Sequence, residues 1–532
     1  MVDEPTKAFP TQKQLEREIE EYLSKKYGDR IKIISQVFQP QTEKEQKSGG
    51  PSLKRPGLFD HFSLKPEDLV AYLDEYVIRQ ENAKDILATK ICTHFHRIRY
   101  ALSRPDHDLR ETGRIKSNVL LIGPTGVGKT YLVKLIADKI GVPFVKGDAT
   151  KFSETGYVGG DVEDLVRDLV EEANGDLELA QYGIIYLDEI DKIAATRNII
   201  GADVSRAGVQ RALLKLMEET EVDMKVPHDP ISMIEAIERY RATGKREKQT
   251  INTKNILFIV SGAFSGLEEI IEKRLHSRTI GFESGLYPAS QRSRILKNVQ
   301  TADLVLYGFE SEFIGRLPVM AVFDELSEED LCQILHNPNS SVIMGKKLDF
   351  NSYGIKIQFE DEALHELALL AAQEHTGARG LVSVVEKTLI PFEKKLPSTD
   401  IQFLVVTPKT VFNPREELKK QLADPGHNQK DHYERLMQKE RLVLMDFISE
   451  KCQAFLAAHN FILTPTRLAL MAEYCQNENM NTRKVCEYFI EYLDAIHACE
   501  QEISKRCSIN ASFSEDAIDR ILVKGSGSRA GF

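Results

Sequence analysis

Short, uninterrupted apolar runs alternate in the middle of the chain with longer segments in which apolar residues recur every three or four positions. The short runs predict buried strands, and the longer segments predict amphipathic helices. Strands that alternate with helices favour a parallel sheet covered by helices, so we expect an α/β fold here. The strand-like runs are residues 118–122, 142–148, 183–188 and 255–260.

The two ends of the chain follow a different pattern. Residues 1–57 are polar and charged, with one helical stripe at 12–26 and a linker-like composition after residue 39. We interpret this region as a polar arm and linker, with a small docking element for a partner as the alternative. Residues 412–532 show only helical spacing, which predicts either a bracing helical bundle or a specific partner-binding domain. The helical segments there are 433–459, 465–476, 482–506 and 514–523.

A glycine-rich segment between the first strand and the following helix is the first candidate site. Its glycines let the backbone curl so that N–H groups point at phosphate oxygens, and the helix N-terminus adds partial positive charge. We expect Lys129 to reach the β- and γ-phosphates of ATP, and Thr130 to ligate Mg²⁺. An ordinary glycine-rich turn is the alternative, and the flanking strand and helix argue against it. The segment consists of Gly123, Pro124, Thr125, Gly126, Val127, Gly128, Lys129 and Thr130.

Two carboxylates follow the apolar run at 183–187 and form the second candidate site. We expect Asp188 to hold Mg²⁺, directly or through water, and Glu189 to orient and polarise the water that attacks the γ-phosphate. Solvated acids at a strand end are the alternative. Ser261 follows the run at 255–260, and it is a candidate for a hydrogen bond to that water or to the γ-phosphate.

Two apolar pairs also call for an explanation. Val77 and Ile78 precede a long amphipathic helix and are candidates for contact with the adenine base, with simple core packing as the alternative. Tyr157 and Val158 lie between glycines, which favours a mobile loop that presents both side chains.

Two arginines near helix ends are further candidates. Arg316 stands between Gly315 and Leu317, and Arg379 opens a helix after Gly377. A guanidinium suits the charge that develops on a transferring phosphoryl group. A surface salt bridge is the alternative for each.

The composition is that of a globular protein, with 42% hydrophobic and 28% charged residues among 532. Acidic residues outnumber basic ones by 81 to 70, and the net charge of −11 argues against non-specific binding of nucleic acid. No apolar run approaches the roughly 18 residues that a membrane span needs. The seven cysteines include no C-x2-C pair, and the start of the chain lacks a signal pattern, so we expect reduced thiols in a cytoplasmic protein.

Taken together, these segments resemble the AAA+ unfoldases of the ClpX and HslU family. The resemblance spans about residues 58–411 and implies a large α/β subdomain at 58–318 and a small α-helical subdomain at 319–411. It also implies a homo-hexameric ring with ATP between neighbouring subunits. The segments that fall in the family's order and spacing are 73–80, 123–130, 156–159, 187–191, 308–318 and 377–380.

The resemblance assigns roles to several residues. It implies that Arg316 reaches the γ-phosphate in a neighbouring subunit and that Arg379 contacts the nucleotide of its own subunit. Tyr157 and Val158 would grip the substrate polypeptide in the pore. A tripeptide similar to one that docks ClpX on the ClpP peptidase is also present, with an ordinary turn as the alternative. It consists of Ile280, Gly281 and Phe282.

The chain also departs from the family. No cysteine precedes Cys92, so the N-terminal zinc domain of ClpX is missing. Arg79 stands where the family commonly has glycine beside the adenine pocket. An insert at 226–249 replaces a pore-entrance loop, and the loop around Ile280 is short, which puts a protease partner in doubt.

We therefore expect an ATP-dependent unfoldase that threads unfolded or tagged proteins through a central pore, with a ClpP-type peptidase as its partner. A remodeller that works without a peptidase, targeted by residues 412–532, is the alternative. A nucleic-acid motor is a third hypothesis. The loop at 156–159 argues against it because a pore that tracks a nucleic-acid strand favours Lys or Arg.

Overall fold

The computed structural model describes eight stretches of the chain. Three predicted features lie outside them: the arm at 1–57, the insert at 226–249 and the docking tripeptide at 280–282. Tyr157 and Val158 also lie outside the described residues. The described stretches are 62–103, 116–152, 160–195, 204–224, 250–276, 289–423, 429–507 and 512–526.

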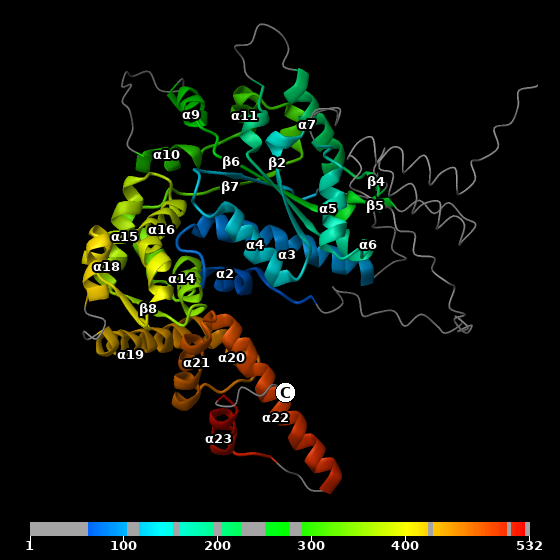
Figure 1. Cartoon of the computed structure of the whole chain (residues 1–532). Helices are drawn as coiled ribbons and strands as arrows, with labels where there is room; N and C mark the ends of the chain where they lie inside the picture. The colour runs from blue at the N-terminus through cyan, green and yellow to red at the C-terminus, as the bar shows by residue number, and fades with distance from the viewer. Residues whose placement is uncertain are drawn as a thin grey trace, which may run out of the picture. The chain divides into compact units, whose positions relative to one another are not determined.

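A five-stranded parallel sheet organises the first part of the described chain (Figure 1). Its strand order is β2-β3-β6-β1-β7, and every neighbouring pair is parallel. Strands β1, β3, β6 and β7 are mostly apolar, as expected where helices cover both faces of a sheet, whereas the edge strand β2 carries Lys146 and Asp148. This confirms the predicted α/β class. The strands are β1 (Val119–Ile122), β2 (Phe144–Asp148), β3 (Ile184–Asp188), β6 (Leu257–Gly262) and β7 (Val319–Val322).

Alternate strand residues enter two separate cores. Val119 and Leu121 of β1 pack with helices on one face, whereas Leu120 and Ile122 pack with helices on the other. The first face is covered by α2 (Pro66–Asp74), α3 (Glu81–Ser103) and α4 (Lys129–Ile140), which lie below the strands in Figure 1. The second face is covered by α5 (Asp164–Glu172), α7 (Val204–Met217), α9 (Leu267–His276), α10 (Ala289–Leu296), α11 (Thr301–Tyr307) and α12 (Ser311–Gly315).

Short elements complete this part of the chain. The antiparallel pair β4 (Glu221–Asp223) and β5 (Thr250–Asn252) flanks the insert, and its central residues Val222 and Ile251 are fully buried. Helix α6 (Leu177–Ala180) precedes β3, and 3₁₀ turns at Ala149–Lys151, Ile190–Ile193 and Thr253–Asn255 follow β2, β3 and β5.

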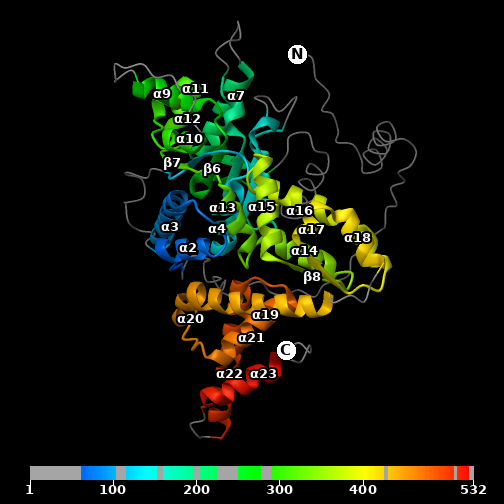
Figure 2. The ribbon, with the colours of Figure 1, turned by 90° about the vertical axis from the view of Figure 1, so that its left-hand side faces the viewer.

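A third core belongs to a small, mainly helical subdomain, whose helices are yellow-green to yellow in Figure 2. Its helices surround a two-stranded parallel sheet of β8 (Lys356–Phe359) and β9 (Phe403–Val406). A short 3₁₀ turn, Leu396–Ser398, connects α16 to β9. The helices are α13 (Glu328–His336), α14 (Ser341–Asn351), α15 (Asp361–Gln373), α16 (Ala378–Lys395), α17 (Pro408–Phe412) and α18 (Pro414–Ala423).

Residues 429–526 form a third unit, which we call the C-terminal module. It has its own core, in which α21 and α22 contribute most of the buried side chains. Its predicted helices are all present, but the one expected at 433–459 is interrupted by a π-helical turn, Ile448–Cys452. The helices are α19 (Gln429–Phe447), α20 (Gln453–Ala458), α21 (Pro465–Glu478), α22 (Thr482–Cys507) and α23 (Glu515–Ser526).

Two predicted boundaries are wrong. Residues 319–322 were expected to begin the small subdomain, but they form β7, which pairs with β1 in the large sheet. The small subdomain was expected to end at 411. Leu418 and Leu422 of α18 are partly buried and pack against its core, so the subdomain continues to residue 423.

Candidate nucleotide-binding and hydrolysis site

The phosphate-binding segment forms the predicted turn between β1 and α4. Gly128 is the N-cap of α4 and has a left-handed conformation (φ 92°) that favours glycine. A side chain at Gly123 would place its Cβ 2.8 Å from that of Phe323. The glycines are therefore required both by the turn itself and by the close approach of a neighbouring strand end.

Lys129 is the first residue of α4, and it is buried at 8% exposure. Its ammonium group donates hydrogen bonds to the carbonyl oxygens of Gly123 (2.6 Å) and Pro124 (2.7 Å). Burial lowers the pKa of Lys129 to about 8, against the opposing effect of Asp188 and Asp191. The lysine is thus held inside the loop, where its charge state responds to any added negative charge.

A chain of hydroxyl groups connects the phosphate-binding loop to the carboxylate at the end of β3. Thr130 Oγ1 donates to Tyr186 Oη (3.0 Å), which lies 2.6 Å from Ser261 Oγ, and Ser261 donates to Asp188 Oδ1 (2.8 Å). Tyr186 and Ser261 are fully buried. Because Ser261 donates to the carboxylate, its oxygen is free to accept from Tyr186, so all three bonds can run in one direction.

Asp188 is the acidic end of this chain. Burial by itself would raise the pKa of Asp188. The hydrogen bond from Ser261 and the ammonium group of Lys146, 3.3 Å from Oδ2, outweigh that effect and hold this pKa below its usual range. The carboxylate is therefore ionised at neutral pH, as a metal ligand must be.

Glu189 lies directly beside Asp188 and is exposed. Its backbone is left-handed (φ 57°), and its N–H donates to Asp188 Oδ1 at 3.1 Å. A non-glycine residue in this conformation is uncommon and is often found at functional sites. The turn directs the chain away from the sheet immediately after the strand, so that Asp188 and Glu189 follow one another at the carboxyl edge.

Ser261 lies within β6 rather than after it. Its hydroxyl is engaged with Tyr186 and Asp188, and it is positioned behind the carboxylate. The contact with the attacking water or the γ-phosphate expected for Ser261 stays a prediction.

The small subdomain meets the phosphate-binding loop at the start of α16. Ala378 N donates to Gly126 O (2.8 Å). Arg379, one residue later, is exposed, and its positive charge contributes to lowering the pKa of Lys129. The structure thus brings Arg379 and the loop together, although they are 250 residues apart in the chain (379 − 129).

The predicted adenine-contact segment follows α2. Val77 is buried at 7% exposure, whereas Ile78 is partly exposed. Gln80 anchors the segment, because its side chain donates to Asp324 O (2.8 Å) and accepts from Asp324 N (2.8 Å). Asp324 belongs to the connection between the large and small subdomains, so the segment lies at their junction.

Arg316 is separate from these groups. It is the C-cap of α12, its side chain is 55% exposed, and Nη2 pairs with Glu218 at 2.5 Å. The fully buried Asn118 donates to the Arg316 carbonyl (3.1 Å) and accepts from Phe258 N (3.2 Å), which fixes the backbone of this turn against the sheet. Arg316 also lines a cavity of about 300 Å³ together with basic side chains that include Lys116 and Lys254.

Comparison with known proteins places this geometry in a family. Residues 114–320 match the AAA domain (Cdc48 subfamily) model. The ATP-dependent Clp protease ATP-binding subunit ClpX of Treponema denticola is 39% identical over 364 residues, which cover 68% of this chain and 84% of that protein. The ClpX proteins of Borrelia duttonii and Borrelia recurrentis are also 39% identical, over 73% of this chain and 85% of theirs. The chain belongs to the ClpX family.

Membership of the ClpX family accounts for the P-loop, the paired carboxylates and the helical small subdomain as one AAA+ unit. Tyr186 is a site residue that sequence reasoning missed in this ClpX-family chain. Its position in a buried apolar run suggested only packing. A tyrosine hydroxyl in such a run needs a hydrogen-bond partner, and that requirement was the available signal.

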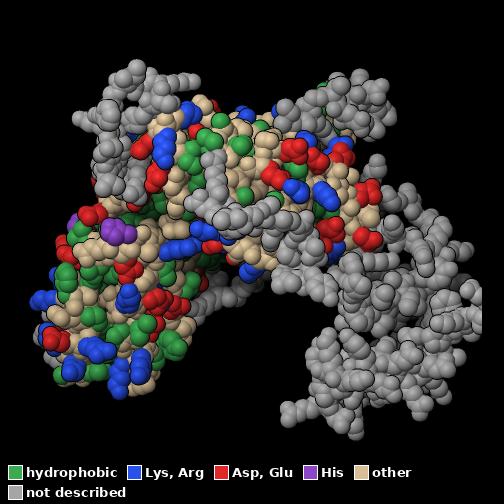
Figure 3. Space-filling model, turned by 90° about the horizontal axis from the view of Figure 1, so that it is seen from above, with side chains coloured by type: hydrophobic (Ala, Val, Ile, Leu, Met, Phe, Trp, Pro, Cys, Tyr) green, Lys and Arg blue, Asp and Glu red, His purple; other side chains and the backbone are tan. Residues whose placement is uncertain are grey.

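Three further observations concern the described residues of this ClpX-family chain. Among the described residues, no group of three His, Cys, Asp or Glu side chains is placed to hold a metal ion. No helix in the described stretches is long and apolar enough to cross a membrane. On the face seen in Figure 3, basic and acidic side chains of the described residues are interspersed.

Proposed function

We propose that this chain is an ATP-dependent protein unfoldase and translocase. It acts as a homo-hexameric ring, threads unfolded or tagged polypeptide through a central pore and delivers it to a ClpP-type peptidase. The observation that carries the proposal is the convergence of Lys129, Thr130, Asp188 and Glu189 at the carboxyl edge of the parallel sheet. Its relatives are named as ATP-binding subunits of the Clp protease.

The residues at this edge fit Mg²⁺. Thr130 supplies a hydroxyl oxygen and Asp188 an ionised carboxylate, and the hydroxyl chain connects the two. Mg²⁺ prefers oxygen ligands and is commonly held by one or two protein groups together with substrate phosphates. When bound, Mg²⁺ would neutralise negative charge on the phosphates of ATP.

The remaining groups have distinct roles in hydrolysis. Glu189 is exposed next to Asp188, so it can orient the attacking water and accept its proton. Lys129 and Arg379 approach the site from the large and the small subdomain and would stabilise charge on the transferring phosphoryl group. Arg316, exposed on a separate turn, would serve the nucleotide of a neighbouring subunit.

Hydrolysis would drive movement of the loop that carries Tyr157 and Val158. An aromatic and a β-branched side chain grip polypeptide through bulk alone, so such a loop would act on many sequences. Ile280, Gly281 and Phe282 would dock the ring on the peptidase, because an exposed apolar tripeptide is costly unless it enters a groove.

A fluorescent protein with an unstructured tail tests the proposal. With ATP and a ClpP-type peptidase, we expect fluorescence to be lost with the wild-type chain and retained with Glu189→Gln. Tyr157→Ala should keep ATP hydrolysis and lose processing. Retained fluorescence with the wild-type chain, despite measurable ATP hydrolysis, would contradict the unfoldase assignment.

The peptidase link is tested separately. Deletion of 280–282 should abolish degradation but leave unfolding intact. Unfolding without degradation products by the wild-type chain would instead indicate a remodeller that works without a peptidase. Unchanged degradation by the deletion variant would remove the docking role of the tripeptide.

A further inference from the structure

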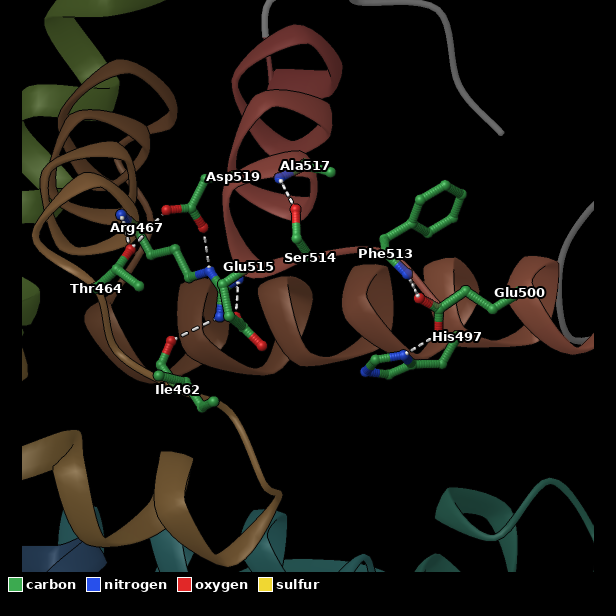
Figure 4. A network of polar contacts seen from close by, with 10 residues as sticks. All are labelled: Ile462, Thr464, Arg467, His497, Glu500, Phe513, Ser514, Glu515, Ala517 and Asp519. Atoms are coloured by element: carbon green, nitrogen blue, oxygen red, sulfur yellow. Dashed lines mark hydrogen bonds and ion pairs between the residues drawn. The ribbon is translucent and has the colours of Figure 1, made fainter. Parts of the chain in front are cut away.

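Two helices of the C-terminal module are anchored to one another by a buried arginine. Arg467 of α21 is 1% exposed, and its guanidinium pairs with Asp519 (2.6 Å) and Glu515 (2.6 Å) at the start of α23. Figure 4 shows these carboxylates and Thr464 gathered around Arg467.

The module contacts the AAA+ unit through a buried ion pair. Arg483, in the first turn of α22, places Nη1 2.8 Å from Oε1 of Glu75, the C-cap of α2. The Arg483 guanidinium also lies 3.3 Å from the ring centroid of Phe455 on α20. Both charged side chains are at least nine-tenths buried, with 9% and 1% exposure. A pair this deeply buried is strongly destabilised when only one partner is removed.

A second contact joins the same helix end to the small subdomain. Asn339 is 4% exposed and lies between α13 and α14. Its side-chain oxygen accepts hydrogen bonds from Thr482 N (2.9 Å) and Oγ1 (3.1 Å), and its amide nitrogen donates to Glu75 O (3.2 Å). The start of α22 is therefore bonded to the large subdomain at Glu75 and to the small subdomain at Asn339, and these two residues are bonded to each other.

Glu75 lies two residues before the predicted adenine-contact pair Val77 and Ile78. After them, Arg79 and Gln80 have successive left-handed conformations (φ 61° and 71°), which non-glycine residues adopt rarely. Side-chain bonds hold this strained segment, with Arg79 on Asp330 at 2.5 Å and Gln80 on the inter-subdomain connection. Segment 75–80 is thus fixed at one end by the module and at the other by the small subdomain.

The charge of Glu75 depends on its partner. Burial raises the pKa of Glu75 to about 7, and the positive charges of Arg483 and Lys139 partly oppose that rise. Without Arg483, burial would raise the pKa of Glu75 further, and the Glu75 side chain would lose the partner that holds it in place.

We propose that Arg483 of the C-terminal module is a positioning residue for the nucleotide. Through Glu75 it fixes segment 75–80, and it thereby sets the affinity for the adenine end of ATP. This inference rests on the proposed nucleotide site. It gives the C-terminal module a task within its own subunit, because it holds the base-binding segment at the junction of the two AAA+ subdomains.

The test is ATP and GTP hydrolysis by the full-length chain as a function of nucleotide concentration. Arg483→Gln should raise the KM for ATP about fivefold or more, with kcat within about twofold of wild type. The preference for ATP over GTP should fall, because the phosphate contacts remain while the base contact loosens. Arg506→Gln, a substitution of an exposed arginine on the same helix, is the matched control and should change neither quantity.

Arg483→Gln leaves Glu75 buried without its partner, so folding is a concern. The double variant Glu75→Gln and Arg483→Met removes both charges and keeps similar side-chain volumes, which buried pairs generally tolerate. It should fold and still show the raised KM and the lost base preference.

Two outcomes separate the inference from the function on which it rests. If wild-type chain hydrolyses ATP and both Arg483 variants keep its KM and base preference, the positioning role is wrong while the nucleotide site stands. If the wild-type chain neither binds nor hydrolyses ATP, the proposed site is wrong and the inference fails with it.

Discussion

Gly126 and Gly377 meet backbone to backbone, and neither position has room for a side chain. A Cβ on Gly126 would lie 2.0 Å from Thr376 O, and one on Gly377 would lie 2.8 Å from Gly126 O. The contact joins the phosphate-binding loop directly to the first turn of the helix that carries Arg379. A movement of the small subdomain would therefore displace the loop that would hold the phosphates.

Replacing Gly377 with alanine should uncouple the two. Gly377 combines φ 61° with ψ −143°, a backbone conformation that essentially only glycine adopts, so Gly377→Ala costs about 1–3 kcal/mol in strain, and the Cβ also pushes against the loop. We expect kcat/KM for ATP to fall at least about tenfold. Gly354→Ala is the control, because Gly354 also has a positive φ (74°) but has open space around it. Equal hydrolysis rates for the two variants would contradict the coupling.

The phosphate-binding loop and the paired carboxylates could be predicted from the sequence because each is a continuous segment. The glycines, Lys129 and Thr130 occupy neighbouring positions, and strand and helix follow from local periodicity. Asp188 and Glu189 likewise end a single apolar run. The structure places these residues at one sheet edge, as parallel strands require.

Other features depend on partners far away in the chain. Strand β7 was assigned to the wrong subdomain because its partner β1 lies 200 residues earlier (319 − 119), and no local pattern reveals that pairing. Glu75 and Arg483 are 408 residues apart, so their ion pair was equally invisible. Tyr186 was missed because strand periodicity gives the burial of a residue and not the hydrogen bond of its hydroxyl group.

Removing the Tyr186 hydroxyl tests the chain between Thr130 and Asp188. Tyr186→Phe leaves Ser261 without one partner in a fully buried position, which should cost about 1–3 kcal/mol in the free energy of unfolding. We also expect a higher Mg²⁺ concentration for half-maximal ATP hydrolysis, because Thr130 loses its orientation. Tyr353→Phe, at a 64% exposed site, is the control. An unchanged Mg²⁺ requirement would show that the hydroxyl chain does not position the ligands.

The affinity for ATP should depend on pH through Lys129. Its pKa of about 8 is lowered by burial, and bound phosphates favour the charged form and so raise this pKa. Below pH 8 the lysine is already charged, and the affinity should be constant. Above pH 8 binding must take up a proton, so the affinity should fall about tenfold per pH unit.

Calorimetry with a non-hydrolysable ATP analogue between pH 7 and 9.5 measures this effect, and two buffers with different ionisation heats report the proton uptake. Lys129→Arg is the matched control, because arginine stays charged throughout and its weaker binding should not vary with pH. A flat pH profile for the wild-type chain would contradict the prediction.

The ion pair between Arg316 and Glu218 must break before Arg316 can reach a neighbouring nucleotide, and the strength of the pair limits how much it can slow hydrolysis. Both side chains are about half exposed, so the pair is worth at most about 1 kcal/mol. Glu218→Ala should therefore raise kcat for ATP no more than about fivefold, whereas Arg316→Ala should nearly abolish hydrolysis. Steady-state hydrolysis rates of the two variants decide the question. A much larger rise in kcat for Glu218→Ala would contradict this prediction and show that the pair with Glu218 strongly inhibits hydrolysis.

The Arg467 anchor should determine whether the C-terminal module is folded. Arg467→Leu leaves Asp519, which is only 14% exposed, without its guanidinium, and loss of a buried partner typically costs about 3–5 kcal/mol. That cost is comparable to the stability of a small helical unit, so α21 and α23 should lose protection in hydrogen exchange while the sheet around β1 keeps it. Arg441→Leu is the control, because the Arg441 side chain is 40% exposed and its pair with Glu473 is long, at 3.6 Å. If α21 and α23 stay as protected in Arg467→Leu as in Arg441→Leu, the buried carboxylate finds another partner, and the core of the module, rather than the ion pairs of Arg467, holds its helices together.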